Sequence, residues 1–174
     1  GNNFVDCHIG VVITGNYNNV SSNTMYSTVA SGTDRSLQAG ISVRSGSYNN
    51  VSSNTIRMID VGKSAIGINV QYIQDLTGTT IVPDASVEMT GNTITGNNIS
   101  IEGGNGCGIR LLGSSGSLVT NVTNNIISNN IIKGAPDTTD MLLYVGNVEF
   151  LSDGTTPTVN DGNLIAGNLV INTG

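Results

Sequence analysis

The chain has 174 residues and a net charge of −6, with only six Lys and Arg residues, which do not cluster. Nucleic-acid binding requires clustered cations that neutralise phosphates, so nucleic acid is excluded as a partner, and an anionic membrane surface is disfavoured for the same reason. No apolar run approaches the ~20 residues of a membrane-spanning helix. Gly (23) and Asn (24), which are poor helix formers, fill more than a quarter of the chain, so we expect an all-β, turn-rich fold.

A phrase of the form Gly-aliphatic-x-aliphatic recurs along the chain. Its copies begin at Gly10, Gly40, Gly67 and Gly108, and a degenerate fifth copy begins at Met141. In the second copy, alternation places Ile41 and Val43 on one face of a strand and Ser42 on the other. The phrase therefore predicts one strand per copy, with the outward positions Val12, Ser42, Asn69, Arg110 and Leu143.

A second phrase, Asn-x-aliphatic or a close variant, follows each copy of the first. Its copies begin at Asn23, Asn54, Asn92, Asn125 and Asn163. The longest match joins residues 14–25, TGNYNNVSSNTM, to residues 45–56, SGSYNNVSSNTI. None of these runs is long enough for an amphipathic helix, and a single unit cannot bury its apolar face alone, so the units must stack.

Stacked units of short strands with variable loops predict a parallel β-helix of about five rungs, with neighbouring rungs about 4.8 Å apart. The repeated asparagines fit this arrangement, because an amide can hydrogen-bond the same amide one rung away and form a ladder. The pairs Asn18-Asn19 and Asn49-Asn50 repeat in register, as do Asn23 and Asn54. We expect residues 1–174 to form one domain of this kind.

The pattern GIxV…NN-V-xxN-TI resembles right-handed parallel β-helix repeats, which pectate-lyase-like enzymes share with phage tailspike and tail-fibre proteins. The resemblance covers essentially the whole chain and implies an all-β, single-stranded, right-handed parallel β-helix (solenoid). The low charge, scarce Cys and abundant Ser, Thr, Asn and Gly look more like a phage fibre than a secreted pectinase. The resemblance also implies a bacterial surface glycan as a partner, a parallel homotrimer, and a location outside the cell on the virion surface.

Two rungs carry insertions between their first two strands, at about residues 71–86 and 146–158. Insertions in a solenoid form surface loops on one side, and such loops often carry the binding function. Tyr17 and Tyr48 fall on the same corner, and the insertions add Tyr72 and Phe150. Because flat rings stack on sugars, the three tyrosines are candidate substrate-binding residues; the alternative is a self-stacking column that covers the edge or contacts another subunit.

Three acidic residues, Asp34, Asp60 and Glu102, lie seven or eight positions before Ile41, Ile68 and Ile109. If the rungs align, these acids form a column across a groove from the tyrosines. Two carboxylates ~5 Å or ~6.5–9.5 Å apart can hydrolyse a glycosidic bond, so the three are candidate catalytic residues of a glycoside hydrolase. Calcium binding and plain solvation are the alternatives. Arg110 on the groove floor is a candidate contact for an anionic sugar, the base of a lyase, or an ordinary surface residue.

Several other chemistries are disfavoured. The run Glu102–Cys107 lacks the Asp of the calcium-binding GGxGxD motif, and the single histidine, His8, makes a Ser-His-Asp or Cys-His triad implausible. Cys7 and Cys107 fall about three rungs, or ~14 Å, apart, which is too far for a disulfide, so we expect free thiols packed as small apolar residues. We expect neither a resident metal nor a cofactor.

Two classes of function follow. The first is the shaft of a tailspike or tail fibre that binds, and in one version hydrolyses, bacterial surface polysaccharide. The second is a structural spacer or adhesin module without chemistry of its own. A polysaccharide lyase is a weaker third reading. Since both ends fall close to strands, we expect a segment of a longer protein, with further rungs or partner chains covering its ends.

Overall fold

The computed structural model of the chain describes residues 1–29, 38–60, 65–71, 87–102, 106–112, 120–134, 142–146 and 161–173. Within these ranges every regular element is a β-strand, as the composition predicts, and all strand pairs are parallel. None of the described elements is a helix long and apolar enough to cross a membrane.

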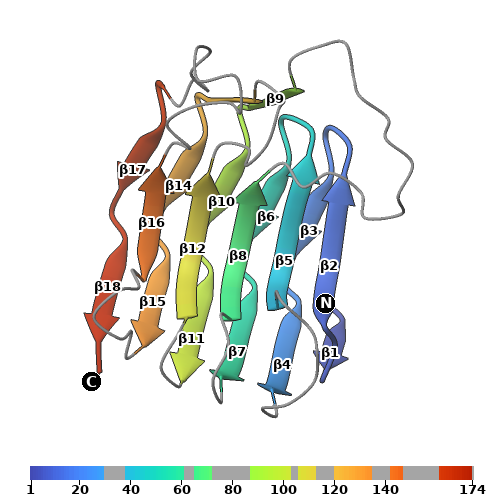
Figure 1. Cartoon of the computed structure of the whole chain (residues 1–174), viewed down its shortest axis with the longest axis vertical. Coiled ribbons are helices and arrows are strands. Elements are labelled where there is room, and N and C mark those ends of the chain that lie inside the picture. The colour runs from blue at the N-terminus through green and yellow to red at the C-terminus, as the bar shows by residue number, and fades with distance from the viewer. Residues whose placement is uncertain are drawn as a thin grey trace, which may run out of the picture.

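Three main sheets are present, numbered here in the order in which the chain passes through them from β2 onwards (Figure 1). Sheet I has the order β16-β12-β8-β5-β2 and comprises β2 (Ile9–Thr14), β5 (Gln38–Ser45), β8 (Ala65–Gln71), β12 (Gly106–Leu112) and β16 (Leu143–Gly146). Sheet II has the order β17-β14-β10-β6-β3 and comprises β3 (Asn19–Ser21), β6 (Asn50–Ser52), β10 (Thr93–Thr95), β14 (Ile126–Ser128) and β17 (Leu164–Ala166).

Sheet III has six strands in the order β1-β4-β7-β11-β15-β18. They are β1 (Asn3–Val5), β4 (Thr24–Val29), β7 (Thr55–Asp60), β11 (Asn98–Glu102), β15 (Ile131–Gly134) and β18 (Leu169–Asn172). A further parallel pair, β9 (Val87–Thr90) with β13 (Thr120–Thr123), lies between sheets I and II along the chain and was not predicted from the sequence.

The chain passes through the sheets in a fixed cyclic order. From β2 to β18 it visits sheet I, then sheet II, then sheet III, and returns to sheet I one strand farther along. Matching letters of the two longest copies become neighbours, because Asn19, Val20 and Ser21 pair with Asn50, Val51 and Ser52. The sequence repeat is therefore a repeat in space.

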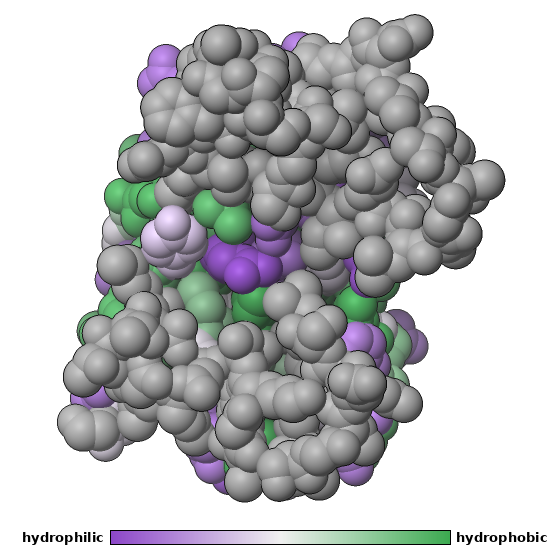
Figure 2. Space-filling model, viewed as in Figure 1, coloured by the Kyte–Doolittle hydropathy of each residue, from purple (hydrophilic) through white to green (hydrophobic). Residues whose placement is uncertain are grey.

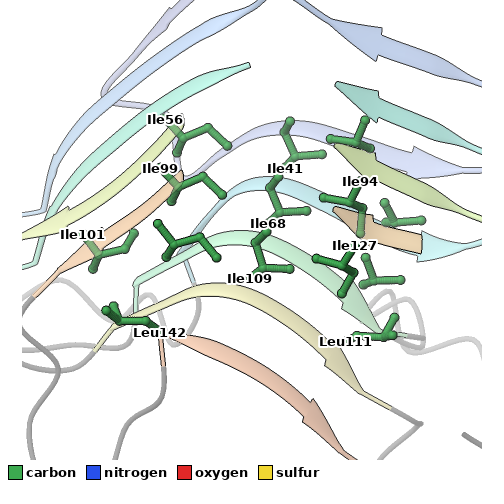
Figure 3. Close-up of a cluster of buried hydrophobic side chains, with 14 of the residues drawn as sticks. Ile41, Ile56, Ile68, Ile94, Ile99, Ile101, Ile109, Leu111, Ile127 and Leu142 are labelled. Atoms are coloured by element: carbon green, nitrogen blue, oxygen red, sulfur yellow. The ribbon is translucent and has the colours of Figure 1, made fainter. Parts of the chain in front are cut away.

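The core is a set of aliphatic files that run across the strands (Figure 3). Ile41, Ile68 and Ile109 of sheet I pair in succession and are each 0% exposed. Equivalent files join Ile56 to Ile99 in sheet III and Ile94 to Ile127 in sheet II. β-Branched side chains suit such files, because they keep one preferred rotamer and stack well on a pleated surface.

Two ladders of asparagine side chains flank sheet II. The first consists of Asn18, Asn49, Asn92, Asn125 and Asn163. The second consists of Asn2, Asn23, Asn54, Asn97, Asn130 and Asn168. At every step the backbone N–H and the side-chain Nδ2 of one asparagine donate to Oδ1 of the next, at 2.8 to 3.2 Å.

The ladders confirm the predicted stacking of Asn18 on Asn49 and of Asn23 on Asn54. The alignment of the later copies was wrong, since Asn92 continues the first ladder, whereas the prediction placed it with Asn54. Each repeat carries two ladder asparagines, five positions apart and both followed by a short aliphatic strand, so the phrase Asn-x-aliphatic matches either one. The fifth copy is also shifted by one residue, because Tyr144, and not Leu143, pairs with Arg110.

The glycines that open the first phrase mark a close approach of sheets I and III. A Cβ on Gly67 would lie 2.5 Å from the Gly108 carbonyl oxygen and 2.5 Å from Ile99 Cγ2. Real Cβ atoms do not tolerate either contact, so the glycine is required by packing, and its recurrence follows from the recurrence of that contact in neighbouring repeats.

The inward face can be tested with Ile68→Asp. Because Ile68 is fully buried among apolar residues, an unpaired carboxylate there should prevent folding. Thr55→Asp, at an exposed strand position, is the matched control and should shift stability by no more than about 0.5 kcal/mol. Circular dichroism melting curves of both variants check this, and a cooperatively melting Ile68→Asp protein would show that the inward face is misassigned.

The ladder can be tested at Asn97, which accepts from Asn54 and donates to Asn130 and to the Val51 carbonyl. Asn97→Leu leaves several buried polar groups unpaired, at roughly 1–3 kcal/mol each, and should lower the free energy of unfolding by several times as much as Asn19→Ala at an exposed site.

Asn97→Asp separates hydrogen bonding from shape. Burial raises the pKa of the introduced carboxyl above its unfolded value of about 3.9, so this variant should be least stable at neutral pH and should recover as the pH falls towards 4 and the group becomes a donor again. Thermal midpoints measured between pH 7 and 4 should show this recovery for Asn97→Asp and not for Asn97→Leu. Equal pH profiles would contradict the role of the ladder.

Candidate functional site

Tyr17 and Tyr48 occupy the same corner of successive repeats, after β2 and β5. Their rings stack with centroids 5.3 Å apart and an angle of 9° between the planes. Both residues have a left-handed backbone, with φ of 60° and 59°, and both are exposed, at 77% and 54%. The predicted aromatic corner is thus present in these two repeats as a stacked pair of exposed rings, and the Tyr48 ring also lies against Gly91 of the next repeat. Tyr72 and most of both insertions lie outside the described residues.

Structural need alone does not explain tyrosine at these positions. The equivalent residue is Gly91, Asn124 or Gly162 in the next three repeats, each with positive φ. A left-handed backbone costs a bulky L-residue about 1–2 kcal/mol, whereas an aromatic pair returns about 0.5–1.5 kcal/mol. Two such residues cost about 2–4 kcal/mol, which a single ring pair does not offset, so stability does not account for the tyrosines, and what they add is exposed aromatic surface.

The outward face of sheet I carries a polar row. Ser42, Asn69, Arg110 and Tyr144 are successive cross-strand partners on β5, β8, β12 and β16. Hydrophilic residues gather at the centre of this face (Figure 2). Ser42 and Asn69 are outward, as predicted, yet they are buried at 1% and 0% exposure, while Arg110 and Tyr144 are partly exposed.

Arg110 is held by two amide oxygens of the neighbouring strand. Its Nε donates to Asn69 Oδ1 at 2.9 Å and its Nη2 donates to Gln71 Oε1 at 2.8 Å. Burial lowers the pKa of Arg110, and the nearby Cys107 and Tyr144 act in the opposite direction, but a guanidinium remains charged at any physiological pH. Arg110 was predicted on this face, but Gln71 was not predicted as its partner. The two-residue alternation of a strand places Gln71 on the same face as Asn69 and so could have indicated it.

The candidate acids are not aligned as a single column. Glu102 on β11 pairs with Ile59, one residue before Asp60, while Asp60 itself pairs with Val29 on β4. The offset arises because the segments that precede sheet I differ in length between repeats, so equal sequence distances do not give equal register. Asp34 lies outside the described residues.

Glu102 is engaged by Arg57, which donates from Nε at 2.7 Å and from Nη2 at 3.1 Å. This hydrogen bonding lowers the pKa of Glu102, and burial acts weakly in the opposite direction. The Arg57 guanidinium also lies 5.6 Å from the centre of the Tyr26 ring. A carboxyl with a lowered pKa is ionised at neutral pH, so Glu102 is unsuited to the role of general acid, which needs a raised pKa.

The cysteines are free thiols, as predicted from the spacing of the rungs. Their expected packing is only partly right, because Cys107 is half-buried in β12 whereas Cys7, just after β1, is exposed. Among the described residues no group of three or more His, Cys, Asp or Glu side chains lies together as a metal site.

Comparisons with known proteins do not indicate a function for these residues. No family model, curated protein or solved structure matches the chain. Function must therefore be argued from the residues themselves.

The Arg57–Glu102 pair gives a pH prediction. Since the folded pKa of Glu102 is depressed, the pair stabilises the fold above the ordinary glutamate pKa of 4.5, and this contribution is lost as the pH falls through the lower folded pKa. The Glu102 carboxyl should titrate below 4.5 in an NMR pH series, and Arg57→Gln should move its midpoint back up. Lys133→Gln, which removes the same charge from the neighbouring strand β15, should move it less.

The effect of this pair on stability should be small, because both side chains are about half exposed and solvent screens the attraction. The thermal midpoint of Arg57→Gln at pH 7 should stay close to that of the unmodified chain. An unshifted Glu102 titration in that variant would mean that the ion pair does not persist in solution.

Proposed function

We propose that the chain is a segment of a right-handed parallel β-helix, of the phage tailspike or tail-fibre type, that binds bacterial surface polysaccharide at the Tyr17–Tyr48 corner. It acts outside the cell, on the virion surface, and it associates as a parallel homotrimer. The proposal that it forms a helix is supported by the cyclic passage through sheets I, II and III and by the advance of one strand per circuit. Parallel crossover connections are right-handed in nearly all proteins, which supports the proposed hand.

The observation that carries the binding proposal is the exposed, parallel-stacked tyrosine pair on a left-handed backbone. The fold requires a left-handed residue at this corner but not a tyrosine, and bulky residues held in such conformations cluster at functional sites. A sugar ring presents a face of C–H groups and an edge of hydroxyls, which match the apolar face and the polar tip of tyrosine. The rigid repeat holds the two rings in place, so little conformational entropy is lost when a sugar chain docks.

The proposal is limited to binding. Hydrolysis needs two carboxyl groups with separated pKa values facing one groove, whereas Arg57 keeps Glu102 ionised and engaged. A structural spacer without ligand is the competing reading, and it differs in what it expects of the tyrosines: in a spacer they would contribute only to the stability of the edge.

The test is the double variant Tyr17→Gly, Tyr48→Gly. Glycine relieves the left-handed strain, so the thermal midpoint should change little, while binding should weaken by at least tenfold. Tyr26→Ala, which removes an aromatic residue from sheet III, is the control and should bind normally. The chain has no Trp, so the emission of its five tyrosines can be followed while a panel of purified O-polysaccharides and capsular polysaccharides is titrated in. The part of the fluorescence change that the double variant loses is the part that comes from the corner.

Two outcomes would reject the proposal. One is the absence of saturable binding to any polysaccharide in the panel. The other is full binding by the double variant, which would move the binding surface away from the corner. A marked loss of stability in the double variant, together with no polysaccharide binding by the unmodified chain, would favour the spacer.

A further inference from the structure

The contacts of Arg110 orient the polar side chains of sheet I. Arginine has only donors, so the atoms of Asn69 and Gln71 that face it must be their oxygens. The amide nitrogen of Asn69 therefore points away from Arg110. This fixes the orientation of the amide without any choice between its oxygen and nitrogen atoms.

Three polar atoms on the β5–β8 side of this face are buried without any hydrogen-bond partner. They are Asn69 Nδ2, Ser42 Oγ and Arg44 Nε. Asn69 and Ser42 are direct cross-strand partners, and Arg44 follows Ser42 by two positions on β5, at the irregularity where the register with β2 shifts. An unpaired buried polar atom costs about 1–3 kcal/mol, and a charged one more, so this cluster is stabilised only when something accepts from it.

The three atoms can donate four hydrogen bonds, two of them from Asn69 Nδ2, and the cluster carries positive charge. None of the five strands of sheet I contains Asp or Glu, whereas Arg44 and Arg110 supply two of the six cations of a chain whose net charge is −6. No ion pair with a described carboxylate neutralises either arginine, since the pair found in the described ranges joins Arg57 to Glu102. An acceptor with negative charge fits these donors better than water or a neutral hydroxyl does.

We propose that Ser42, Arg44, Asn69 and Arg110 form a binding site for the carboxylate of an acidic saccharide. The two arginines are partly exposed, while the buried Ser42 and Asn69 form the base of the site. β5 ends at Ser45 and Tyr48 follows shortly after, so the site adjoins the tyrosine corner along one strand. The inference rests on the proposed function and narrows it from polysaccharide in general to one that carries uronic acid.

The probe is a glucuronate-containing oligosaccharide, and its control is the same oligomer after reduction of the carboxyl groups. The intact oligomer should bind at least tenfold more tightly than the reduced one, and more weakly as salt is raised. Arg44→Gln should remove most of this difference. Lys133→Gln makes the same change in net charge on sheet III and should leave the difference intact, which separates a specific site from the overall charge.

Ser42→Ala gives a readout that a purely structural role would not produce. It removes a buried, unpaired hydroxyl, so the unliganded protein should melt at an equal or higher temperature, while its affinity for the acidic oligomer should fall about threefold or more. Loss of stability together with unchanged affinity would overturn the assignment.

The remaining outcomes separate this site from the proposed function. Equal binding of the intact and reduced oligomers would overturn the carboxylate site and leave polysaccharide binding at the tyrosines standing. Displacement of the oligomer by an equal concentration of inorganic phosphate would overturn the assignment to a saccharide, because a general anion site does not distinguish the two. No binding of either oligomer, with normal binding of neutral polysaccharides from the panel, would reject this site alone.

Discussion

Each buried ladder asparagine satisfies the main chain and the side chain of the neighbouring repeat at once. Its Oδ1 accepts two hydrogen bonds from one repeat, while in most repeats its Nδ2 also reaches a backbone carbonyl, as Asn130 does with Ile94. These bonds form in the interior, where Asn125 and Asn130 are 0% exposed and where an unpaired amide is expensive. The requirement that every repeat supply an asparagine at the same height fixes the register of all three sheets.

The rest of the molecule follows from that register. The aliphatic files of Ile41, Ile68 and Ile109 exist because the ladders hold successive strands level. A left-handed residue precedes every ladder asparagine from Asn18 onwards, where the chain turns into the next sheet. In the first ladder this residue is a tyrosine in the first two repeats, whereas in the second ladder it is Ser22 or Ser53. The same register therefore also places Tyr17 next to Tyr48 and Ser42 beside Asn69. The candidate binding surface thus follows from the repeat, and a few side chains give it its specific chemistry.

Much of the fold could be predicted from the sequence, because the structural repeat appears directly as a repeat of residue types. The parallel all-β fold, the inward face of the Gly-aliphatic phrase, the first steps of the ladders, the tyrosine stack and the free thiols all follow from which residues recur. Register through loops of unequal length could not be predicted, which is why Glu102 lies opposite Ile59 and Tyr144 replaces Leu143 beside Arg110. Hydrogen bonds such as those from Arg110 to Asn69 and Gln71 depend on rotamers, and a repeat pattern carries no information on them.

All the ladder amides point the same way, with their donors towards the higher-numbered neighbour. A repeat duplicated in tandem would find amide acceptors in one neighbouring repeat and amide donors in the other, as the original repeat does. A repeat inserted in the reverse orientation would instead place one asparagine Oδ1 against another. Whole repeats can thus be added or removed without changing the hydrogen bonding or packing of the interior. Tandem duplication of a repeat is a route that this chemistry leaves open, and the similarity of residues 14–25 to residues 45–56 fits it.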